Sequence, residues 1–482
     1  MAGAEKVFDI VIVGAGVSGI NCAYRIQTQL PQLSYVILEE RNGIGGTWDL
    51  FKFPGVRSDA DLYTYGFEWN KWPFAHPIAE GSLIMWYLND TTSKFSIKEH
   101  IRFRHRVQSA AWSSKSRQWS FVVDNNGQTE CYGSRWFIMA SGYFDYETPR
   151  KTDIPGLNNF RGKVIHPQFW PTDYNYHSKK IAIIGSGATA ITLLPNLAKK
   201  AAEVTMVQRS PTYILAVKNS DRDPSKISRY LPLSIAGIYE RLWFLIIPYL
   251  FILFYKFWPT RAQDMLYKQA RDRLPGFVDA NTHFRPRYNP CDQRICISPE
   301  GDFYDSFHRN GKVVSGCIEN ITSNKIHMKG GQAVDADVIV TATGLQMRFG
   351  GGIRIQVDEE QVEWPNRLMW NRAMIEGVPN MIFMIGYTTS AWTLGVDNSA
   401  FYLCRLLRYM KYHGVSTAIP QCLKDDKMAV SGIFQLRSTY VIEGNKKMPV
   451  YGSMGPWRPR IHPPLDWAAA RWGDYTTGLR FS

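Results

Sequence analysis

The chain has 482 residues, enough for two or three domains with buried cores. Apolar residues make up 45% and charged residues 20%, as in ordinary globular proteins. The net charge is +14, but the sequence has no block of lysine and arginine and no zinc-finger or RNA-recognition spacing. We therefore expect no nucleic-acid partner, and we attribute the charge to a basic surface and to sites for phosphate-bearing ligands.

Cysteine usage and the first residues indicate the compartment. The seven cysteines are odd in number and scattered, which is typical of reduced thiols rather than of a disulfide framework. The first apolar run, at 7–13, is short and leads directly into Gly14, so it indicates a strand and not a signal peptide. We expect a cytoplasmic protein.

The first segment has the pattern of a dinucleotide-binding βαβ unit. The apolar run at 7–13 predicts a buried parallel strand, and the loop 14–19 that follows has the form G-x-G-x-x-G. A helix is expected at 20–30 and a second strand at 35–38. Glu39 ends that strand, where a carboxylate accepts hydrogen bonds from ribose hydroxyls. The three glycines permit the tight turn, the approach of a pyrophosphate and close helix packing, and they are Gly14, Gly16 and Gly19.

A second unit of the same kind begins at 180–184 and continues into a loop of the form G-x-G-x-x-A. The strand expected at 203–209 ends without the acidic residue of an NAD site. Arg209 stands there instead, and a guanidinium pairs with a 2′-phosphate, so NADPH is favoured over NADH. The residues expected to bind this cofactor are Gly185, Gly187, Thr189, Ala190, Arg209 and Ser210.

Two such units predict an α/β fold with two Rossmann-like dinucleotide-binding domains and a helical insertion. Glycine-ended strands at 136–142 and 338–344 mark where the chain passes between the domains. We expect the first domain at 1–145 and 335–482, a linker at 146–178, and the second domain at 179–334 with the insertion at about 217–290.

Three longer signatures lie outside the glycine loops. Residues 160–171 have the form F-x-G-x-x-x-H-x-x-x-W-P, and residues 45–59 have the form G-G-x-W-x-x-x-x-F-P-G-x-x-x-D. With the Asn-Pro-Cys-Asp-Gln-Arg segment at 289–294, they resemble the Baeyer–Villiger branch of the class B flavoprotein monooxygenases. Pro171 after Trp170 favours that branch, because the N-oxidising relatives typically carry Tyr-Arg there. The resemblance is strongest to the subgroup of thioamide-prodrug-activating and long-chain-alkane-oxidising monooxygenases.

The resemblance implies roles for particular residues. It implies FAD at the first loop, NADPH at the second, and Arg294 as the catalytic arginine oriented by Asp59. It also implies that His166 and Trp170 couple domain movement to NADPH binding rather than act as acid or base. Gln293 departs from the family, in which many members carry a lysine. The residues expected to contact FAD are Gly14, Gly16, Gly19, Glu39, Gly46, Thr47, Trp48, Asp59 and Val107.

The implied reaction inserts one atom of O2 into a hydrophobic substrate through a C4a-peroxyflavin, with FAD and NADPH as cofactors. Oxidation of a ketone to an ester or lactone is the expected outcome, and natural-product metabolism is the expected context. Oxygenation of sulfur or nitrogen, or hydroxylation, is the alternative within the same fold. The sequence identifies neither the substrate nor the oligomeric state.

Two other features leave alternatives open. Cys291 and Cys296 have the C-x4-C spacing of a disulfide reductase, although they lie far from the FAD loop. The uncharged run at 242–255 is shorter than the roughly 20 residues of a bilayer span. It suits a peripheral membrane contact or the wall of a substrate pocket, and it also admits a membrane-associated redox scaffold without turnover.

Overall fold

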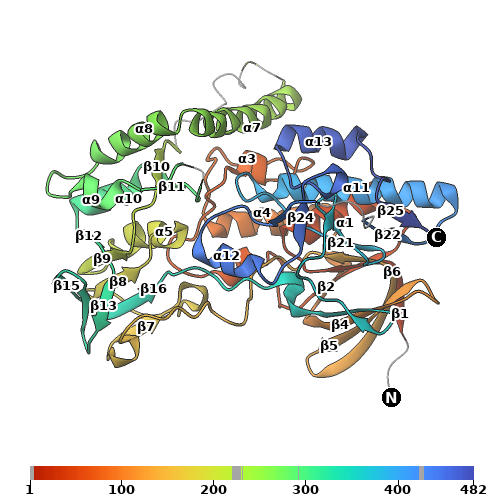
Figure 1. Cartoon of the computed structure of the whole chain (residues 1–482), viewed down its shortest axis with the longest axis horizontal. Coiled ribbons are helices and arrows are strands. Elements are labelled where there is room, and N and C mark those ends of the chain that lie inside the picture. The colour runs from red at the N-terminus through yellow and green to blue at the C-terminus, as the bar shows by residue number, and fades with distance from the viewer. Residues whose placement is uncertain (1–4, 220–229, 231, 291, 423–427) are drawn as a thin grey trace.

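The computed structural model describes residues 5–219, 230, 232–290, 292–422 and 428–482. Figure 1 shows two lobes, the first built from both ends of the chain and the second from its middle. This arrangement agrees with an α/β fold of two dinucleotide-binding domains.

The first lobe is organised by a nine-stranded sheet. Its strand order is β18-β17-β4-β5-β6-β1-β2-β3, and β21 pairs with β6. Neighbours β1 and β2 are parallel, as are β1 and β6, whereas β4, β5 and β6 form an antiparallel meander. The strands are β1 (Lys6–Val13), β2 (Tyr35–Glu39), β3 (Ile101–Phe103), β4 (His105–Ser113), β5 (Gln118–Asn125), β6 (Gln128–Met139), β17 (Arg354–Val357), β18 (Glu360–Gln361) and β21 (Met381–Phe383).

The second half of β1, residues 10–13, is continuously apolar because both faces of the sheet are covered there. Ile10 and Ile12 pack in a core shared with α1 (Val17–Gln29) and α11 (Trp392–His413). Val11 and Val13 point to the opposite face, where they join side chains of β4 and β5. The carboxyl ends of β1 and β2 therefore lie at a rigid edge, which is where the first glycine loop sits.

The second lobe contains a parallel five-stranded sheet in the order β12-β9-β8-β16-β7. The strands are β7 (Lys163–Ile165), β8 (Lys180–Ile184), β9 (Glu203–Gln208), β12 (Gly311–Ser315) and β16 (Val338–Thr341). Two of them depart from the expected boundaries. The linker supplies β7 to this sheet, and β16, which follows the expected return at 335, pairs with β8. The chain re-enters the first sheet only at β17, because β16 is needed to cover β8.

The insertion leaves and rejoins the second lobe at one point. Strands β10 (Ile214–Val217) and β11 (Cys296–Pro299) bracket it and pair in parallel. It contains α7 (Leu233–Phe257), α8 (Pro259–Arg271) and α9 (Ala280–Phe284). Helix α7 lies along the upper edge of the molecule in Figure 1 and contacts α3 (Leu62–Tyr65) of the first lobe. The insertion therefore spans the junction between the lobes.

The remaining elements complete the two lobes. They are α2 (Thr47–Leu50), α4 (Gly81–Lys94), α5 (Ala188–Leu197), α10 (Asp302–Asp305), β13 (Ile318–Ile321), β14 (Lys325–Met328), β15 (Ala333–Asp335), β19 (Met369–Trp370), β20 (Met374–Ile375), β22 (Ala418–Pro420), β23 (Val430–Gly432), α12 (Thr439–Asn445), β24 (Val450–Gly452), α13 (Pro463–Trp472) and β25 (Leu479–Phe481).

Candidate active site at the junction of two cavities

The first glycine loop is shaped by close backbone contacts. Gly14 has φ +105°, and a Cβ on it would lie 2.6 Å from the carbonyl oxygen of Ala140. A Cβ on Gly19 would lie 1.9 Å from the carbonyl oxygen of Gly14, so α1 packs directly under the turn. Gly16 is different, because its nearest neighbour would be the Cα of Gly46 at 3.8 Å. Gly14 and Gly19 are required by the fold, whereas Gly16 leaves space that a ligand can use.

Glu39 holds the loop from the end of β2. Its Oε2 accepts a hydrogen bond from the backbone N–H of Ala15 at 2.7 Å, and its Oε1 accepts one from the N–H of Arg41 at 2.9 Å. Burial raises the pKa of this carboxyl group. Each oxygen retains a further lone pair for a ribose hydroxyl, since a carboxylate has about four acceptor positions.

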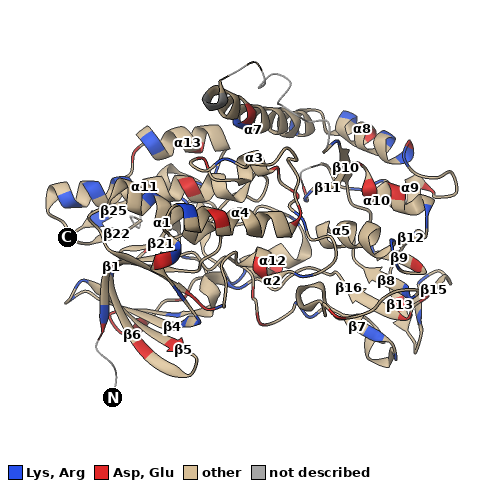
Figure 2. Ribbon diagram, turned by 180° about the vertical axis from the view of Figure 1, so that it is seen from behind, with Lys and Arg blue, Asp and Glu red and all other residues tan. Residues whose placement is uncertain are grey.

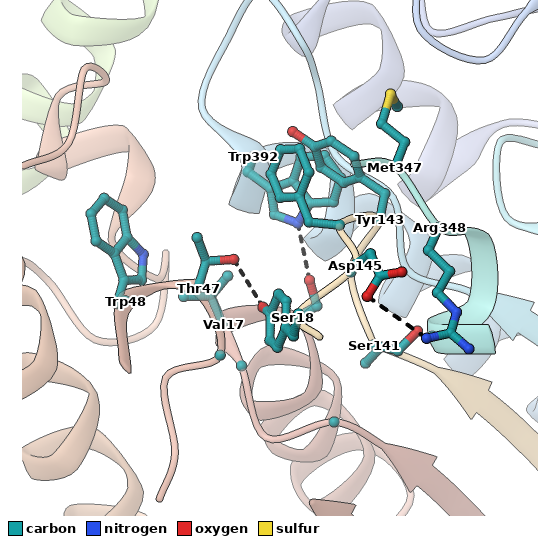
Figure 3. A pocket seen from close by; sticks show the side chains of 18 of the residues that line it. Val17, Ser18, Thr47, Trp48, Ser141, Tyr143, Asp145, Met347, Arg348 and Trp392 are labelled. Atoms are coloured by element: carbon teal, nitrogen blue, oxygen red, sulfur yellow. Dashed lines mark hydrogen bonds and ion pairs between the residues drawn. The ribbon is translucent and has the colours of Figure 1, made fainter. Parts of the chain in front are cut away.

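A cavity of about 300 Å³ opens in front of this loop. Figure 3 shows Thr47 and Trp48 on one side of it and Tyr143 and Trp392 on the other. Thr47 contacts the Tyr146 hydroxyl at 3.0 Å, and the indole N–H of Trp392 donates to Ser18 at 3.0 Å. Of the residues expected to contact FAD, Gly19 lies beneath the cavity, and those that line it are Gly14, Gly16, Glu39, Gly46, Thr47, Trp48, Asp59 and Val107.

The cavity has the character of a flavin nucleotide site. Aromatic rings form one wall, glycine backbone forms the other, and the N-terminus of α1 points at the gap and favours negative charge. The buried hydroxyl oxygen of Ser141, on the cavity wall, has no hydrogen-bond partner among the described residues. A bound dinucleotide would satisfy this oxygen, so the residues present fit FAD.

Arg294 and Asp59 meet in the lining of the cavity, although they are 235 positions apart in the chain. An Arg294 guanidinium nitrogen lies 3.2 Å from the Asp59 carboxylate. The negative charge of Asp59 raises the pKa of Arg294, so the arginine is a permanent cation. The Arg294 side chain nevertheless keeps 47% of its surface exposed and can contact a ligand. Burial raises the pKa of Tyr143 beside it, so that phenol remains neutral.

A second cavity, of about 500 Å³, lies on the other side of Arg294. Its wall is largely apolar and comes from the inner side of α7, with Phe244, Ile247, Pro248, Ile252 and Tyr255. The residues that line both cavities are Asp59, Ala60, Arg294, Thr388, Ser390 and Leu436. The ion pair therefore stands at the boundary between a nucleotide-shaped cavity and an apolar one. Part of the 242–255 run is thus a pocket wall.

The second glycine loop repeats the construction of the first. Gly185 has φ +131°, and a Cβ on it would lie 2.2 Å from the carbonyl oxygen of Ala342. A Cβ on Gly187 would meet nothing within 4 Å. Thr189 and Ala190 lie in the first turn of α5, so an anion at this helix N-terminus would be favoured.

Arg209 follows β9 at the same edge of the second sheet. The residue is exposed, and its guanidinium has no ion-pair partner in the described part of the chain. The carbonyl of Ser210 accepts a hydrogen bond from Ser186 of the glycine loop at 3.2 Å. An unpaired guanidinium next to the loop is suited to a 2′-phosphate.

The signature histidine and tryptophan line neither of the two cavities. His166 accepts a hydrogen bond from the N–H of Gln168 at 3.3 Å and caps a short helical turn. Burial lowers its pKa, which favours the neutral ring. Gln168 donates to the Asp145 carbonyl at 2.7 Å, and Asp145 lines the first cavity. Trp170 is buried in the core of the second lobe. The linker thus connects that core to the cavity wall.

Several aromatic and hydroxyl residues of the first cavity were not expected from the sequence. Ser141 and Tyr143 follow β6, and their signal was the glycine-ended strand exit at 136–142. Tyr146 lies shortly after the same strand exit, whereas Trp392 and Tyr440 come from segments far along the chain that carry no local signature.

The cysteine pair does not form a redox site in the described residues. Cys291 lies outside them, and Cys296 is a buried free thiol. Burial raises the pKa of Cys296 to about 12, so the thiol is protonated and unreactive at neutral pH.

Comparison with known proteins places this geometry in a family. Residues 7–228 match the FMO-like family, "Flavin-binding monooxygenase-like". The FAD-containing monooxygenase EthA of Mycobacterium tuberculosis (strain ATCC 25618 / H37Rv) is 38% identical over 478 residues, covering 98% of this chain and 97% of the relative. The probable FAD-binding monooxygenase AlmA of Acinetobacter baylyi is 38% identical, with 94% of this chain and 92% of the relative covered.

Solved structures share the fold at lower identity. The crystal structure of OTEMO in complex with FAD and NADP has a TM-score of 0.76 at 21% identity, covering 99% of this chain and 100% of that one. The open crystal structure of cyclohexanone monooxygenase has a TM-score of 0.76 at 18% identity with the same coverage. The chain, with its two dinucleotide loops and the cavity in front of the first, belongs to the FMO-like flavin-binding monooxygenase family and is a flavoprotein monooxygenase.

Proposed function

We propose that this monooxygenase carries out the Baeyer–Villiger oxidation of an apolar ketone, with FAD and NADPH as cofactors. The observation that carries the proposal is the Arg294–Asp59 pair, which lies where the two cavities meet. Family membership supports the monooxygenase chemistry, and the apolar second cavity supports a hydrophobic substrate. Two solved structures with the same fold, at 18% and 20% identity, are of a cyclohexanone monooxygenase and a steroid monooxygenase, and a ketone substrate is consistent with these names.

Different residues would hold the two cofactors. The first cavity would hold FAD, with Gly16 and Glu39 as the residues for its pyrophosphate and ribose. The second glycine loop and Arg209 would hold NADPH and its 2′-phosphate. When bound, the flavin would take a hydride from NADPH and activate O2 for transfer to the substrate.

Arg294 provides the electrostatic part of the mechanism. Oxygen that attacks a carbonyl does so as an anion, and the guanidinium stabilises the negative charge on the oxygen before and after attack. Asp59 holds the guanidinium in this orientation, and its negative charge raises the pKa of Arg294 further. Because the cation is already in position, the protein need not rearrange when the negative charge develops.

The second cavity holds the substrate and excludes water. The cavity has a volume of about 500 Å³ and a lining of mainly apolar side chains. It therefore suits a ring or chain with few polar groups. In the overall reaction a ketone, O2, NADPH and a proton give an ester or lactone, NADP⁺ and water. One oxygen atom enters the bond between the carbonyl carbon and its neighbour, and the other leaves as water after accepting two electrons.

The compartment is part of the proposal. The six described cysteines are free thiols, which supports a reducing environment such as the cytoplasm.

The test is direct. Purified holoenzyme with NADPH is incubated with a panel of apolar ketones and a matched panel of sulfides, and products are scored by the mass of one added oxygen atom. Conversion of ketones to esters or lactones is the expected result. Products from sulfides alone would support heteroatom oxygenation instead. If the rate of NADPH consumption is the same with and without every substrate, the proposed turnover is wrong.

A further inference from the structure

Helix α7 has an inner face that is fixed to the protein. Phe244 and Tyr255 are each only 4% exposed. Arg241 donates hydrogen bonds to the carbonyl oxygens of Tyr63 and Gly66 at 2.9 and 3.2 Å. These contacts, together with the wall that α7 gives to the second cavity, hold the helix along the surface of the molecule.

The outer face of α7 is apolar and exposed. Five aliphatic residues recur every three or four positions, and each has between 49% and 58% of its surface exposed: Ile235, Ile238, Leu242, Ile246 and Leu250. The sequence contains no charged residue from 242 to 255. Figure 2 shows α7 nearly without charge, in contrast to the neighbouring α8. A contiguous apolar stripe of this length normally marks a surface that something covers.

Helix α13 extends this surface. It lies at the same edge of the molecule as α7 in Figures 1 and 2, and the rings of Tyr249 and His462 contact each other with centroids 5.0 Å apart. Its Leu465, Trp467 and Trp472 are 58%, 39% and 72% exposed. We call the five aliphatic residues of α7 and these three residues of α13 the outer apolar face.

Charge indicates what covers the outer apolar face. Lys256 at the end of α7 is exposed, as are Arg261 and Lys268 on α8, the helix that follows α7 in the chain. The whole chain carries a net charge of +14, so a second copy approaching this face would meet like charge. Anionic lipid headgroups offer the opposite charge, and tryptophans with basic flanks are typical of helices that lie in a membrane interface.

We propose that the outer apolar face lies in the interfacial layer of an anionic lipid bilayer, with α7 parallel to the membrane plane. Within the described residues, one helix segment, Ile235–Phe257, is long and apolar enough to cross a membrane. A crossing orientation would detach Phe244, Tyr255 and Arg241 from the body and remove the wall of the second cavity. The in-plane orientation keeps all of these contacts.

The same helix connects the membrane to the substrate cavity. Phe251 and Met265 line the second cavity and are also 43% and 37% exposed, so they form part of its rim. The rim lies next to the outer stripe of α7. Apolar substrate dissolved in the bilayer therefore reaches the cavity without passing through water. This step rests on the proposed function, whereas membrane binding does not.

The first experiment measures membrane binding. FAD-loaded full-length protein is sedimented with vesicles of phosphatidylcholine and phosphatidylglycerol (about 7:3), and with vesicles of phosphatidylcholine alone. We expect binding to the anionic vesicles, weaker binding when salt screens the charges, and release by alkaline carbonate. The triple variant Leu242→Ser, Ile246→Ser and Leu250→Ser changes residues that do not line the second cavity. It should bind about a hundredfold more weakly or worse, because three apolar side chains are lost from the interface.

A matched variant controls for exposed apolar residues in general. Val7→Ser, Val430→Ser and Ile442→Ser alter side chains that are 58%, 61% and 52% exposed on other elements, and binding should be unchanged. Failure of the native protein to sediment, or equal sedimentation of the two triple variants, overturns the proposal. So does retention after carbonate, which indicates a spanning helix. A dimer in light scattering that the Leu242/Ile246/Leu250 variant converts to a monomer assigns the face to a second copy instead.

The second experiment tests substrate access. A long-chain methyl ketone dissolved in the vesicles and a short water-soluble ketone are compared. The α7 triple variant should oxidise the soluble ketone at the native rate and lose most of its rate with the bilayer-dissolved one. Equal rates with the bilayer-dissolved ketone overturn access from the membrane. If the native protein binds vesicles but oxidises neither ketone, the proposed function fails while the membrane contact stands.

Discussion

Arg294 lines both cavities, as does its ion-pair partner Asp59, and the arginine is the cationic member of the pair. Removal of a preorganised group that stabilises a developing charge often slows the chemical step by about a hundredfold or more. Lysine at this position keeps the charge but loses the planar fork that pairs with Asp59.

We predict that Arg294→Ala folds, retains FAD and is still reduced by NADPH, because neither glycine loop changes. Oxygenation should fall about a hundredfold or more, with hydrogen peroxide in place of product, and Arg294→Lys should recover part of the rate. The measurements are flavin content, anaerobic bleaching by NADPH, and product yield against peroxide. Arg309→Ala, an exposed arginine before β12, is the control. Near-native oxygenation by Arg294→Ala would remove this residue from the mechanism.

His166 caps a short helical turn, and its titration is expected to affect how the stability of the protein depends on pH. Burial lowers its pKa in the folded state, whereas the unfolded value is about 6.5. Its contribution to the free energy of unfolding is therefore complete above about pH 6.5 and is lost as the pH falls through the lowered folded value.

We predict that the native protein loses more thermal stability between about pH 7.5 and about pH 5.5 than His166→Asn does. Asparagine keeps an acceptor for the capping hydrogen bond from Gln168 but does not titrate. Melting temperatures of both proteins at the two pH values provide the measurement. An identical loss in both would show that the histidine does not contribute to the pH dependence.

At the scale of elements, different glycines of the β1–loop–α1 unit serve folding and ligand binding. Gly19 is enclosed by the backbone of the loop, and a methyl group there would overlap the Gly14 carbonyl. Gly16 has an extended backbone and open space in front of it. Glycine is therefore needed at position 19 for helix packing and at position 16 for the approach of a ligand.

We predict that Gly19→Ala destabilises the protein severely, because helix and strand must separate to admit the new methyl group. Gly16→Ala should fold normally but bind FAD much more weakly, since the methyl group occupies the approach to the pyrophosphate. Circular dichroism melting and flavin titration distinguish the two outcomes. A Gly16→Ala protein with native FAD affinity would contradict the placement of the pyrophosphate at this glycine.

For the whole molecule, the two lobes are linked by contacts that cross between them. Arg57 of the first lobe forms an ion pair with Asp302 of α10 in the second, with one nitrogen–oxygen distance of 3.2 Å. The linker adds β7 to the second sheet, and α7 rests on α3. A ligand that binds one lobe is therefore expected to stabilise the whole.

We predict that NADP⁺ raises the melting temperature of the FAD-loaded protein more than NAD⁺ does. Binding at about 100 times the Kd contributes about 2.7 kcal/mol to the free energy of unfolding. Arg209→Ala should abolish the difference between the two nucleotides, because it removes the partner of the 2′-phosphate, and Arg309→Ala should preserve it. Equal protection by NADP⁺ and NAD⁺ in the native protein would contradict the assignment of Arg209.

Local sequence predicted the elements that depend on neighbouring residues. The apolar run of β1, the turn at Gly14 and the ends of β8 and β9 follow from backbone conformation and continuous burial, which short segments specify. The expected domain boundary at 335 precedes β16, yet β16 pairs with β8 of the second lobe. This pairing joins strands far apart in the chain, and the residues of β16 alone do not specify it.

The sequence by itself determined that there are two dinucleotide loops, that one ends in a carboxylate and the other in an arginine, and that 242–255 is apolar. Only the tertiary structure decided that the Arg294–Asp59 pair lies between two cavities, that Tyr143 and Trp392 share a wall, and that α7 has one face in a cavity and the other in solvent. The physical reason is that cavities and ion pairs of this kind arise from contacts between residues far apart in the chain. Such contacts exist only after the lobes have packed together.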